Sequence, residues 1–334
     1  MTDVTARRIA HHRETVREFS QKGGPLDPNG PNATTANRQW FFESSVGSYT
    51  PERGRLHERL LAEAWAERPG VRADRRAIVL AGPPGAGKST IREKVLGPQE
   101  DRWLFVDADE FKRKLLAEAV RDGSYEEHLK PSAIKEREAA GEAFYPLELA
   151  ALVHEESSYL ATRLRDEALS KGTNVVLDAV LSNSDKAVAL GRILERAEYR
   201  VEVIDVEVPY EVSELQITQR WREAYEGALT SGDGLGGRWV PSDFTRSVFD
   251  SETGRSLSQD AAQKLAQSCA SVERYRRYWR PSNDAQAVVE VDQTRRVPGG
   301  ALVDTALVAT VSRGQARRAE IRRNLGDRSK GTGR

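Results

Sequence analysis

Short runs of apolar residues alternate along the chain with longer segments whose apolar residues recur every three or four positions. The runs have the length of buried strands and occupy residues 77–81, 103–106, 174–178, 201–208 and 286–291. Strands that alternate with helical segments are typical of a parallel sheet with helices on its faces, so the pattern predicts an α/β fold with about five parallel strands. The fourth run alternates polar and apolar residues, which indicates a strand at the sheet edge.

Helical patterns extend the chain at both ends of this α/β region. We expect an N-terminal helical extension and linker at residues 1–74, a main domain at 75–295, and a C-terminal helix and basic tail at 296–334. The extension contains helical patterns at residues 3–20 and 56–65, with a Gly/Pro-rich loop between them. The first of these helices could cover the cleft of the main domain or complete its core, and we favour the core.

A helical pattern also runs from Leu257 to Tyr275 and leads into Tyr275–Arg280, where basic and aromatic residues interleave. Such a run can stack nucleobases. At the end of a helix it is more typical of a packed terminus with charged heads in water, and we interpret it so.

The first apolar run leads directly into a glycine-rich loop of the form G-x-x-x-x-G-K-[ST]. Glycine lets several backbone N–H groups point into one concavity, and the following helix adds its own free N–H groups. In this pattern Lys88 reaches the β- and γ-phosphates of a nucleotide, and the Ser89 hydroxyl is a ligand of Mg²⁺. The sequence therefore predicts a P-loop NTPase-like fold with ATP and Mg²⁺ as cofactors. The expected ATP-binding residues are Gly82, Pro83, Pro84, Gly85, Ala86, Gly87, Lys88, Ser89 and Thr90.

Carboxylates follow two of the other predicted strands. Asp107 and Asp109 come after the second run, and Asp178 ends the third. Ligands of open α/β sheets bind beyond the carboxyl ends of the strands, where the P-loop also lies. One of the first two aspartates should cap the next helix, which leaves the other as a candidate catalytic base. Asp178 has the position of an acid close to the magnesium ion.

Arginines follow the fourth predicted strand in two consecutive elements. A helical pattern at residues 212–225 carries Arg220 and Arg222, and Arg238 closes the glycine-rich segment 227–237. Glycines around an arginine predict a flexible lid that carries positive charge. Because phosphoryl transfer depends mainly on positioning and on neutralising charge, arginines from these two elements are candidate catalytic residues.

Charge and cysteine content narrow the classes of partner. Fifty-one basic residues balance fifty-one acidic ones, which argues against nucleic-acid and membrane partners. The single cysteine, Cys269, excludes an internal disulfide framework and fits a reducing compartment. There is no signal-peptide pattern and no run of about 20 apolar residues, so the expected location is the cytoplasm.

These motifs, in this order, resemble the zeta-toxin family of P-loop kinases, bacterial toxins that phosphorylate UDP-N-acetylglucosamine. The likeness covers residues 75–245. The matching elements are the P-loop, the D-x-D-x-F-K segment Asp107–Lys112, the strand ending in Asp178, Arg220 before an aromatic residue, and the R-x-x-P element Arg238–Pro241.

The resemblance implies a function for these residues. Asp109 would be the catalytic base, while Lys88, Arg220 and Arg238 would act on the phosphates. The implied acceptor is the 3′-hydroxyl of the amino sugar in UDP-N-acetylglucosamine, whose phosphorylation blocks cell-wall synthesis. An antitoxin protein that covers the nucleotide site is the implied partner.

The substrate side of the motif departs from the family. The family has a glutamate on the helix before the third strand, but a gap-free count places Thr162 there, so Glu155 and Glu156 are the nearby candidates. Ser182 stands where an arginine is common. The expected substrate-binding residues are Glu156, Asp178 and Ser182.

Two other functions are compatible with the motifs. The protein could be a kinase of another acceptor: a nucleotide, an antibiotic hydroxyl or a nucleic-acid end, the last disfavoured by the absence of net charge. It could also be a regulatory switch that hydrolyses ATP without phosphorylating a metabolite.

Overall fold

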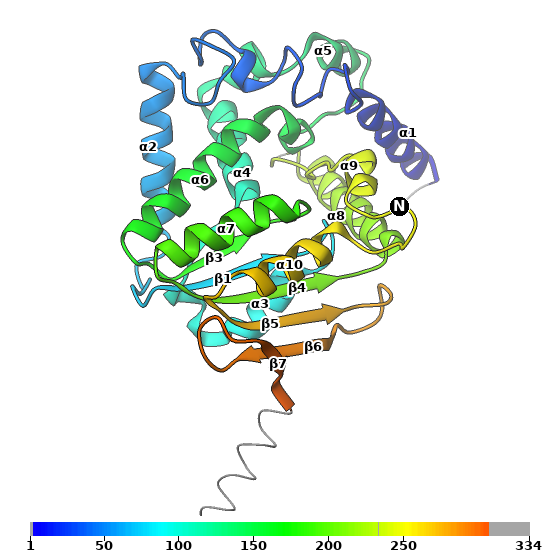
Figure 1. The fold of residues 1–334 in the computed structure, drawn as a ribbon. Helices are drawn as coiled ribbons and strands as arrows, with labels where there is room; N and C mark the ends of the chain where they lie inside the picture. The colour runs from blue at the N-terminus through cyan, green and yellow to red at the C-terminus, as the bar shows by residue number, and fades with distance from the viewer. Residues whose placement is uncertain (1–2, 233, 307–334) are drawn as a thin grey trace, which may run out of the picture.

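The computed structural model describes residues 3–232 and 234–306. A seven-stranded sheet crosses the molecule in the order β2-β3-β1-β4-β5-β6-β7 (Figure 1). The first five strands in that order are parallel, and β6 and β7 extend the sheet in antiparallel fashion. The strands are β1 (Arg76–Ala81), β2 (Leu104–Val106), β3 (Val175–Asp178), β4 (Arg200–Glu207), β5 (Val272–Trp279), β6 (Val288–Arg295) and β7 (Leu302–Asp304).

Most of the helices lie on one face of the sheet, and α3 lies on the other (Figure 1). The described helices are α1 (Asp3–Phe19), α2 (Pro51–Ala66), α3 (Lys88–Leu96), α4 (Ala108–Asp122), α5 (Ser132–Ala139), α6 (His154–Ser170), α7 (Ser184–Arg196), α8 (Tyr210–Ser231), α9 (Ser242–Ser247) and α10 (Leu257–Ser268). Shorter helical turns are η1 (Thr34–Ala36), η2 (Gly97–Arg102), η3 (Tyr125–Leu129) and η4 (Pro146–Val153). None of the helices within these described ranges has the length and apolarity needed to cross a bilayer.

Successive side chains of the central strands point to opposite faces of the sheet and so fill two separate hydrophobic cores. Val79 of β1 joins the larger core under α4, α6, α7 and α10, whereas its neighbour Leu80 joins the smaller core on the side of α3. Successive residues of a strand point to opposite faces, so a strand covered on both faces must be apolar throughout. This is why β1 could be recognised as a continuous apolar run.

The predicted α/β class is confirmed, but the sheet has two more strands than expected. The helix predicted from Leu257 to Tyr275 ends at Ser268, and residues 272–279 form β5. In this strand Val272, Tyr275 and Tyr278 are buried. Aromatic and β-branched residues favour a strand, and the helical spacing of the apolar residues continued only by coincidence beyond Ser268.

The last strand lies where a C-terminal helix and tail were expected. β7 occupies part of the segment 296–334 and pairs with β6. The rest of this predicted segment, residues 307–334, lies outside the described residues.

The prediction that residues 201–208 form an edge strand is wrong, because β4 pairs with β1 and β5. Two of its polar residues, Glu202 and Asp205, find partners on β5 in place of solvent. Arg276 Nε donates to a Glu202 carboxylate oxygen over 2.6 Å, and the Tyr275 hydroxyl is 3.1 Å from Asp205 Oδ2. These two polar residues of β4 therefore face polar partners on the neighbouring strand β5 within the sheet.

The N-terminal extension contributes to the same core as the strands. Ile9 and Val16 of α1, and Leu60 and Leu61 of α2, are buried in the larger core. Leu26, in the loop between the two helices, is fully buried there as well. Of the two arrangements considered for the first helix, the structure shows the one in which it completes the core.

Candidate active site

The phosphate-binding loop joins β1 to α3. Gly82 has φ +141°, and a Cβ at this position would collide with the carbonyl of Val206 on the neighbouring strand β4. Gly85 has φ +71°, and a Cβ there would lie only 2.7 Å from the Ser213 carbonyl oxygen on α8. Only glycine fits both positions. Ser213 Oγ also donates a hydrogen bond of 2.6 Å to the Pro84 carbonyl, so α8 fixes the loop from outside.

Lys88 is the first residue of α3 and points back into the loop. Its Nζ donates to the Gly82 carbonyl over 3.0 Å and lies 3.7 Å from Asp178 Oδ1 at the end of β3. The ammonium group, the loop and the start of α3 combine the positive features that bind phosphate at helix N-termini. The structure therefore forms an anion site where the motif predicts one.

The two aspartates after β2 have different surroundings. Asp107 caps α4, because its Oδ1 accepts the Asp109 backbone N–H over 2.8 Å. Asp109 Oδ1 instead accepts from Lys112 Nζ over 3.0 Å and from Arg238 Nη1 over 2.9 Å. Among the described residues, Asp109 Oδ2 has no hydrogen-bond donor. The division into one cap and one available carboxylate matches the sequence-based expectation.

Burial and neighbouring charges separate the pKa values of these carboxyls. Burial, together with the nearby Asp178 and Asp109, raises the pKa of Asp107 to about 6. Burial also acts to raise the pKa of Asp109, but Arg238 and Lys112 outweigh it, so this pKa lies below its usual value. Asp109 is therefore a carboxylate at neutral pH, which is the form that can accept a proton.

Arg238 is held by its neighbours in the segment after α8. Leu147 donates its backbone N–H to the Leu235 carbonyl over 2.8 Å and accepts from Trp239 N over 3.3 Å. The segment is thus attached on both sides of Arg238. Its guanidinium reaches Asp109 from there.

Arg220 lies on the face of α8 that meets the P-loop. Ser213 and Gln216 on this helix touch the loop at Pro84 and Gly85, and Arg220 follows one turn later on the same side. Its side chain is exposed and forms no ion pair within the described part of the chain. The structure thus brings Arg220 to the loop but only Arg238 to Asp109.

Glu156 does not lie in an open cleft, contrary to the substrate-binding role expected of it. It is fully buried on α6, where its carboxylate accepts from Arg53 Nε over 2.5 Å and Nη2 over 2.8 Å. His57 Nε2 lies 2.7 Å from the same carboxylate. These partners come from α2 and occupy the group, whereas the neighbouring Glu155 is exposed.

The other two expected substrate-side residues follow β3. Asp178 is beside Lys88, and burial, opposed by Lys88, raises its pKa. Ser182 is partly exposed in the loop between β3 and α7.

Arg280 is a site residue that the sequence analysis placed at a helix end. β5 carries it to the sheet edge, where its Nη2 donates to the Gly85 carbonyl over 3.3 Å. The signal that could have identified it is the strand-forming composition of residues 272–279, since parallel strands end at the same edge as the P-loop.

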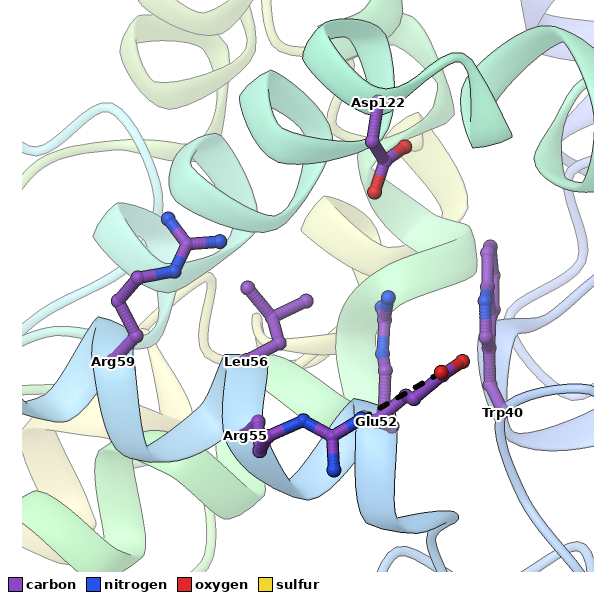
Figure 2. Close-up of a pocket in the computed structure, with 7 residues that line it drawn as sticks. Trp40, Glu52, Arg55, Leu56, Arg59 and Asp122 are labelled. Atoms are coloured by element: carbon purple, nitrogen blue, oxygen red, sulfur yellow. Dashed lines mark ion pairs between the residues drawn. The ribbon is translucent and has the colours of Figure 1, made fainter.

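A pocket of about 430 Å³ lies away from this edge, between α2, the end of α4 and Trp40 (Figure 2). Leu56 and Arg59 point from α2 towards α4, and Asp122 lines the far side (Figure 2). Asp122 ends α4 whereas Asp109 begins it, so the two lie roughly 20 Å apart along the helix. This pocket is distinct from the phosphate site.

The family model described as "Zeta toxin" matches residues 63–286. A comparison with curated proteins gives no match.

Several solved structures have a similar fold. The AvrRxo1-ORF1:AvrRxo1-ORF2 complex with sulphate ions matches with a TM-score of 0.52 at 22% identity, over 78% of this chain and 72% of that chain. The same complex with ATP matches with a TM-score of 0.50 at 20% identity, over 80% and 74% of the two chains. A structure from the PezAT chromosomal toxin-antitoxin system of Streptococcus pneumoniae gives 0.46 at 18% identity, over 74% and 83%. At such identities the likeness shows the fold alone.

Proposed function

Because the chain belongs to the zeta-toxin family, we propose that it is an ATP-dependent kinase of the 3′-hydroxyl of the amino sugar in UDP-N-acetylglucosamine. Such a reaction would block cell-wall synthesis. The observation that carries the proposal is the ion pair between Asp109 and Arg238 at the sheet edge where the P-loop holds Lys88. A proton acceptor and a phosphate-neutralising cation are the two groups that transfer to a hydroxyl requires.

In this reaction the acceptor hydroxyl attacks the γ-phosphorus of ATP. A new oxygen–phosphorus bond forms, the bond from the γ-phosphorus to the β–γ bridging oxygen breaks, and ADP leaves. Asp109 accepts the hydroxyl proton on Oδ2, since Oδ1 is used by Lys112 and Arg238. A positioned general base typically contributes about 10²–10⁴-fold.

The cations neutralise the charge of the transferring group. Lys88 and the loop amides hold the phosphates, while Arg238 and Arg220 approach the γ-phosphoryl from the side of α8. Arginines in related P-loop reactions contribute about 10³–10⁵-fold.

The residues at this edge fit a magnesium ion shared with the nucleotide. Ser89, on the first turn of α3, and Asp178 would hold it, and the ion when bound supplies positive charge to the β- and γ-phosphate oxygens. No cluster of three or more acidic, histidine or cysteine side chains within the described ranges could bind a metal by itself. This fits Mg²⁺, which typically uses one or two carboxylates together with substrate phosphates.

The base assignment is tested with Asp109→Asn. We expect this variant to bind ATP like the wild type and to lose transfer by about 10²-fold or more. The measurement is the mass gain of one phosphate on the acceptor under Mg-ATP. Glu110→Gln is the matched control, because Glu110 is the adjacent acid and pairs with Arg113 instead. Wild-type turnover in Asp109→Asn would exclude Asp109 as the base.

The acceptor is tested separately with a panel of sugar nucleotides, nucleotides and hydroxylated antibiotics. A mass gain on UDP-N-acetylglucosamine supports the proposed acceptor. A gain on another compound alone would keep the kinase and replace the acceptor. ATP turnover that no candidate acceptor changes would favour the regulatory switch.

We also propose a protein partner that inhibits this chain. Two of the similar structures are complexes of AvrRxo1-ORF1 with AvrRxo1-ORF2, and one of them also contains ATP. Co-expression with a candidate antitoxin should give a purified complex that has lost phosphoryl transfer, whereas wild-type turnover in the complex would contradict an inhibitory partner.

A further inference from the structure

His12, on helix α1, is buried between two carboxylates and two aromatic rings. Its Nε2 lies 2.9 Å from Glu148 Oε1 and its Nδ1 lies 2.7 Å from Glu142 Oε1. The ring stacks on Tyr225 with centroids 4.5 Å apart and meets Phe144 edge-on at 4.6 Å. Every side of this imidazole is therefore in contact with a residue from outside the N-terminal extension.

Glu148 connects His12 to helix α8. Its Oε1 also accepts a 2.9 Å hydrogen bond from Trp221 Nε1, and its Oε2 accepts from the backbone of Tyr145 over 2.9 Å. The carboxylate is only 1% exposed. Because these hydrogen bonds fix the buried Glu148 carboxylate in one position, its bond to Nε1 also fixes the position of the Trp221 indole.

Trp221 in turn supports the segment that carries Arg238. The backbone of Trp221 lies so close to Gly237 that any side chain there would collide with it. Trp239 meets the Trp221 ring edge-on with centroids 5.4 Å apart. The backbone of Leu147, the residue before Glu148, holds the same segment on its other side through Leu235 and Trp239.

The contacts of Trp221 are adjacent in the chain to both candidate catalytic arginines. Arg220 precedes Trp221, and Arg238 stands between Gly237 and Trp239. The packing of Trp221 against Gly237 and Trp239 therefore restricts the backbone beside both arginines. Displacements of about 1 Å at a reacting centre can cost about 10²-fold in rate.

We propose that His12 is a positioning residue for Arg220 and Arg238, acting through Glu148 and Trp221. Helix α1 is then part of the catalytic apparatus, although it precedes residues 63–286 that match the family. The inference rests on the proposed function for the roles of the two arginines, but the support of the Arg238 segment by His12 does not depend on it.

The test compares His12→Gln with two controls on the same helix. Val16→Ala removes fully buried apolar contacts of α1 but keeps the His12 imidazole and its two carboxylate partners, and His11→Gln changes an exposed histidine. We expect His12→Gln to lower kcat about 10- to 100-fold with little change in ATP affinity. Val16→Ala should lower the melting temperature but keep kcat, and His11→Gln should change neither. An equal loss of kcat in His12→Gln and Val16→Ala would overturn the proposal.

A second measurement needs no acceptor and separates this inference from the proposed function. Trypsin cleaves after Arg238 when its segment is released, and mass spectrometry identifies the fragment that ends there. We expect faster cleavage at this bond in His12→Gln than in Val16→Ala. A wild-type cleavage rate in His12→Gln would overturn the proposal even if the wild-type protein phosphorylates no tested acceptor. Should His12→Gln fail to fold, Trp221→Phe, which keeps the ring and removes the N–H donor, provides the same two measurements with the same expected outcomes.

Discussion

The acid–base behaviour of Asp109 follows from two cations beside one oxygen. Lys112 and Arg238 keep its pKa below the usual value against the effect of burial. We therefore expect Lys112→Met to raise this pKa, which moves the acid limb of the pH–rate profile to higher pH. The profile of kcat/KM measures the shift.

The control for this prediction is Arg113→Met. Arg113 is the next cation on α4, but it pairs with Glu110 and is exposed. Its removal should leave the acid limb in place. An unshifted limb in Lys112→Met would contradict the assignment of that limb to Asp109.

The adjacent residues Glu155 and Glu156 of α6 test whether the buried ion pair of Glu156 stabilises the fold. Glu156→Gln should destabilise the fold by about 3–5 kcal/mol, because it breaks a buried ion pair and leaves Arg53 without its partner. The exposed Glu155→Gln should change stability by less than about 0.5 kcal/mol. Urea unfolding measures both. Equal, small effects would show that the Arg53–Glu156–His57 cluster does not stabilise the protein.

The charge on His12 should make stability fall at alkaline pH. Burial acts to lower its pKa, but Glu148 and Glu142 outweigh this and raise the pKa above 6.5. A group whose pKa is raised in the folded state stabilises the fold fully at pH values below its unfolded pKa. This stabilisation is lost as the pH rises through the pKa of the folded state. The wild-type melting temperature should therefore drop above about pH 6.5 more steeply than that of His12→Gln. Parallel curves for the two proteins would contradict a charged His12.

At the scale of elements, strand β1 was predicted from the sequence and strand β5 was not. β1 is apolar on both faces and was recognised as a strand. β5 combines buried aromatic residues with arginines that pair across the sheet, as Arg276 does with Glu202. These partners lie far away in sequence, so the only local sign of the strand was its strand-forming composition, and the helical spacing of the preceding apolar residues outweighed it.

The close contact between the P-loop and β4 gives a prediction at the same scale. Gly82→Ala should abolish ATP binding, because the new Cβ would displace the loop from the Val206 carbonyl. Gly123→Ala is the matched control: φ is +83° there, but the space around it is open. It should lower stability modestly and keep the ATP affinity. Calorimetric titration with ATP compares the two variants, and wild-type affinity in Gly82→Ala would contradict the role given to this contact.

For the whole molecule, the N-terminal extension behaves as part of the fold. It supplies Ile9, Val16 and Leu60 to the central core, and its Arg53 and His57 hold the Glu156 carboxylate. A truncated protein starting at Gly70 should therefore lose cooperative unfolding, as measured by circular dichroism during heating. A truncated protein that melts like the full chain would show that the extension is dispensable.

The parts of the site that the sequence could predict are those encoded within a single segment. The P-loop, the aspartates after β2 and the arginine after the glycine-rich segment each have a local signature, and the rule for parallel strands places them at one edge. Glu156 was misplaced because its partners are on α2, in an extension with no motif of its own. His12 likewise depends on contacts that only the folded chain defines, whereas Arg280 follows a strand whose composition gave a local signal.

The pairing of Arg238 with Asp109 has a consequence for timing. A γ-phosphoryl group that draws Arg238 towards itself also removes a positive neighbour from Asp109. The carboxylate then binds a proton more tightly than it did in the idle protein. In the proposed reaction, ATP binding would therefore raise the pKa of Asp109 and make it a stronger acceptor for the proton of the substrate hydroxyl. This stronger base would exist only while a phosphoryl group is bound and ready for transfer.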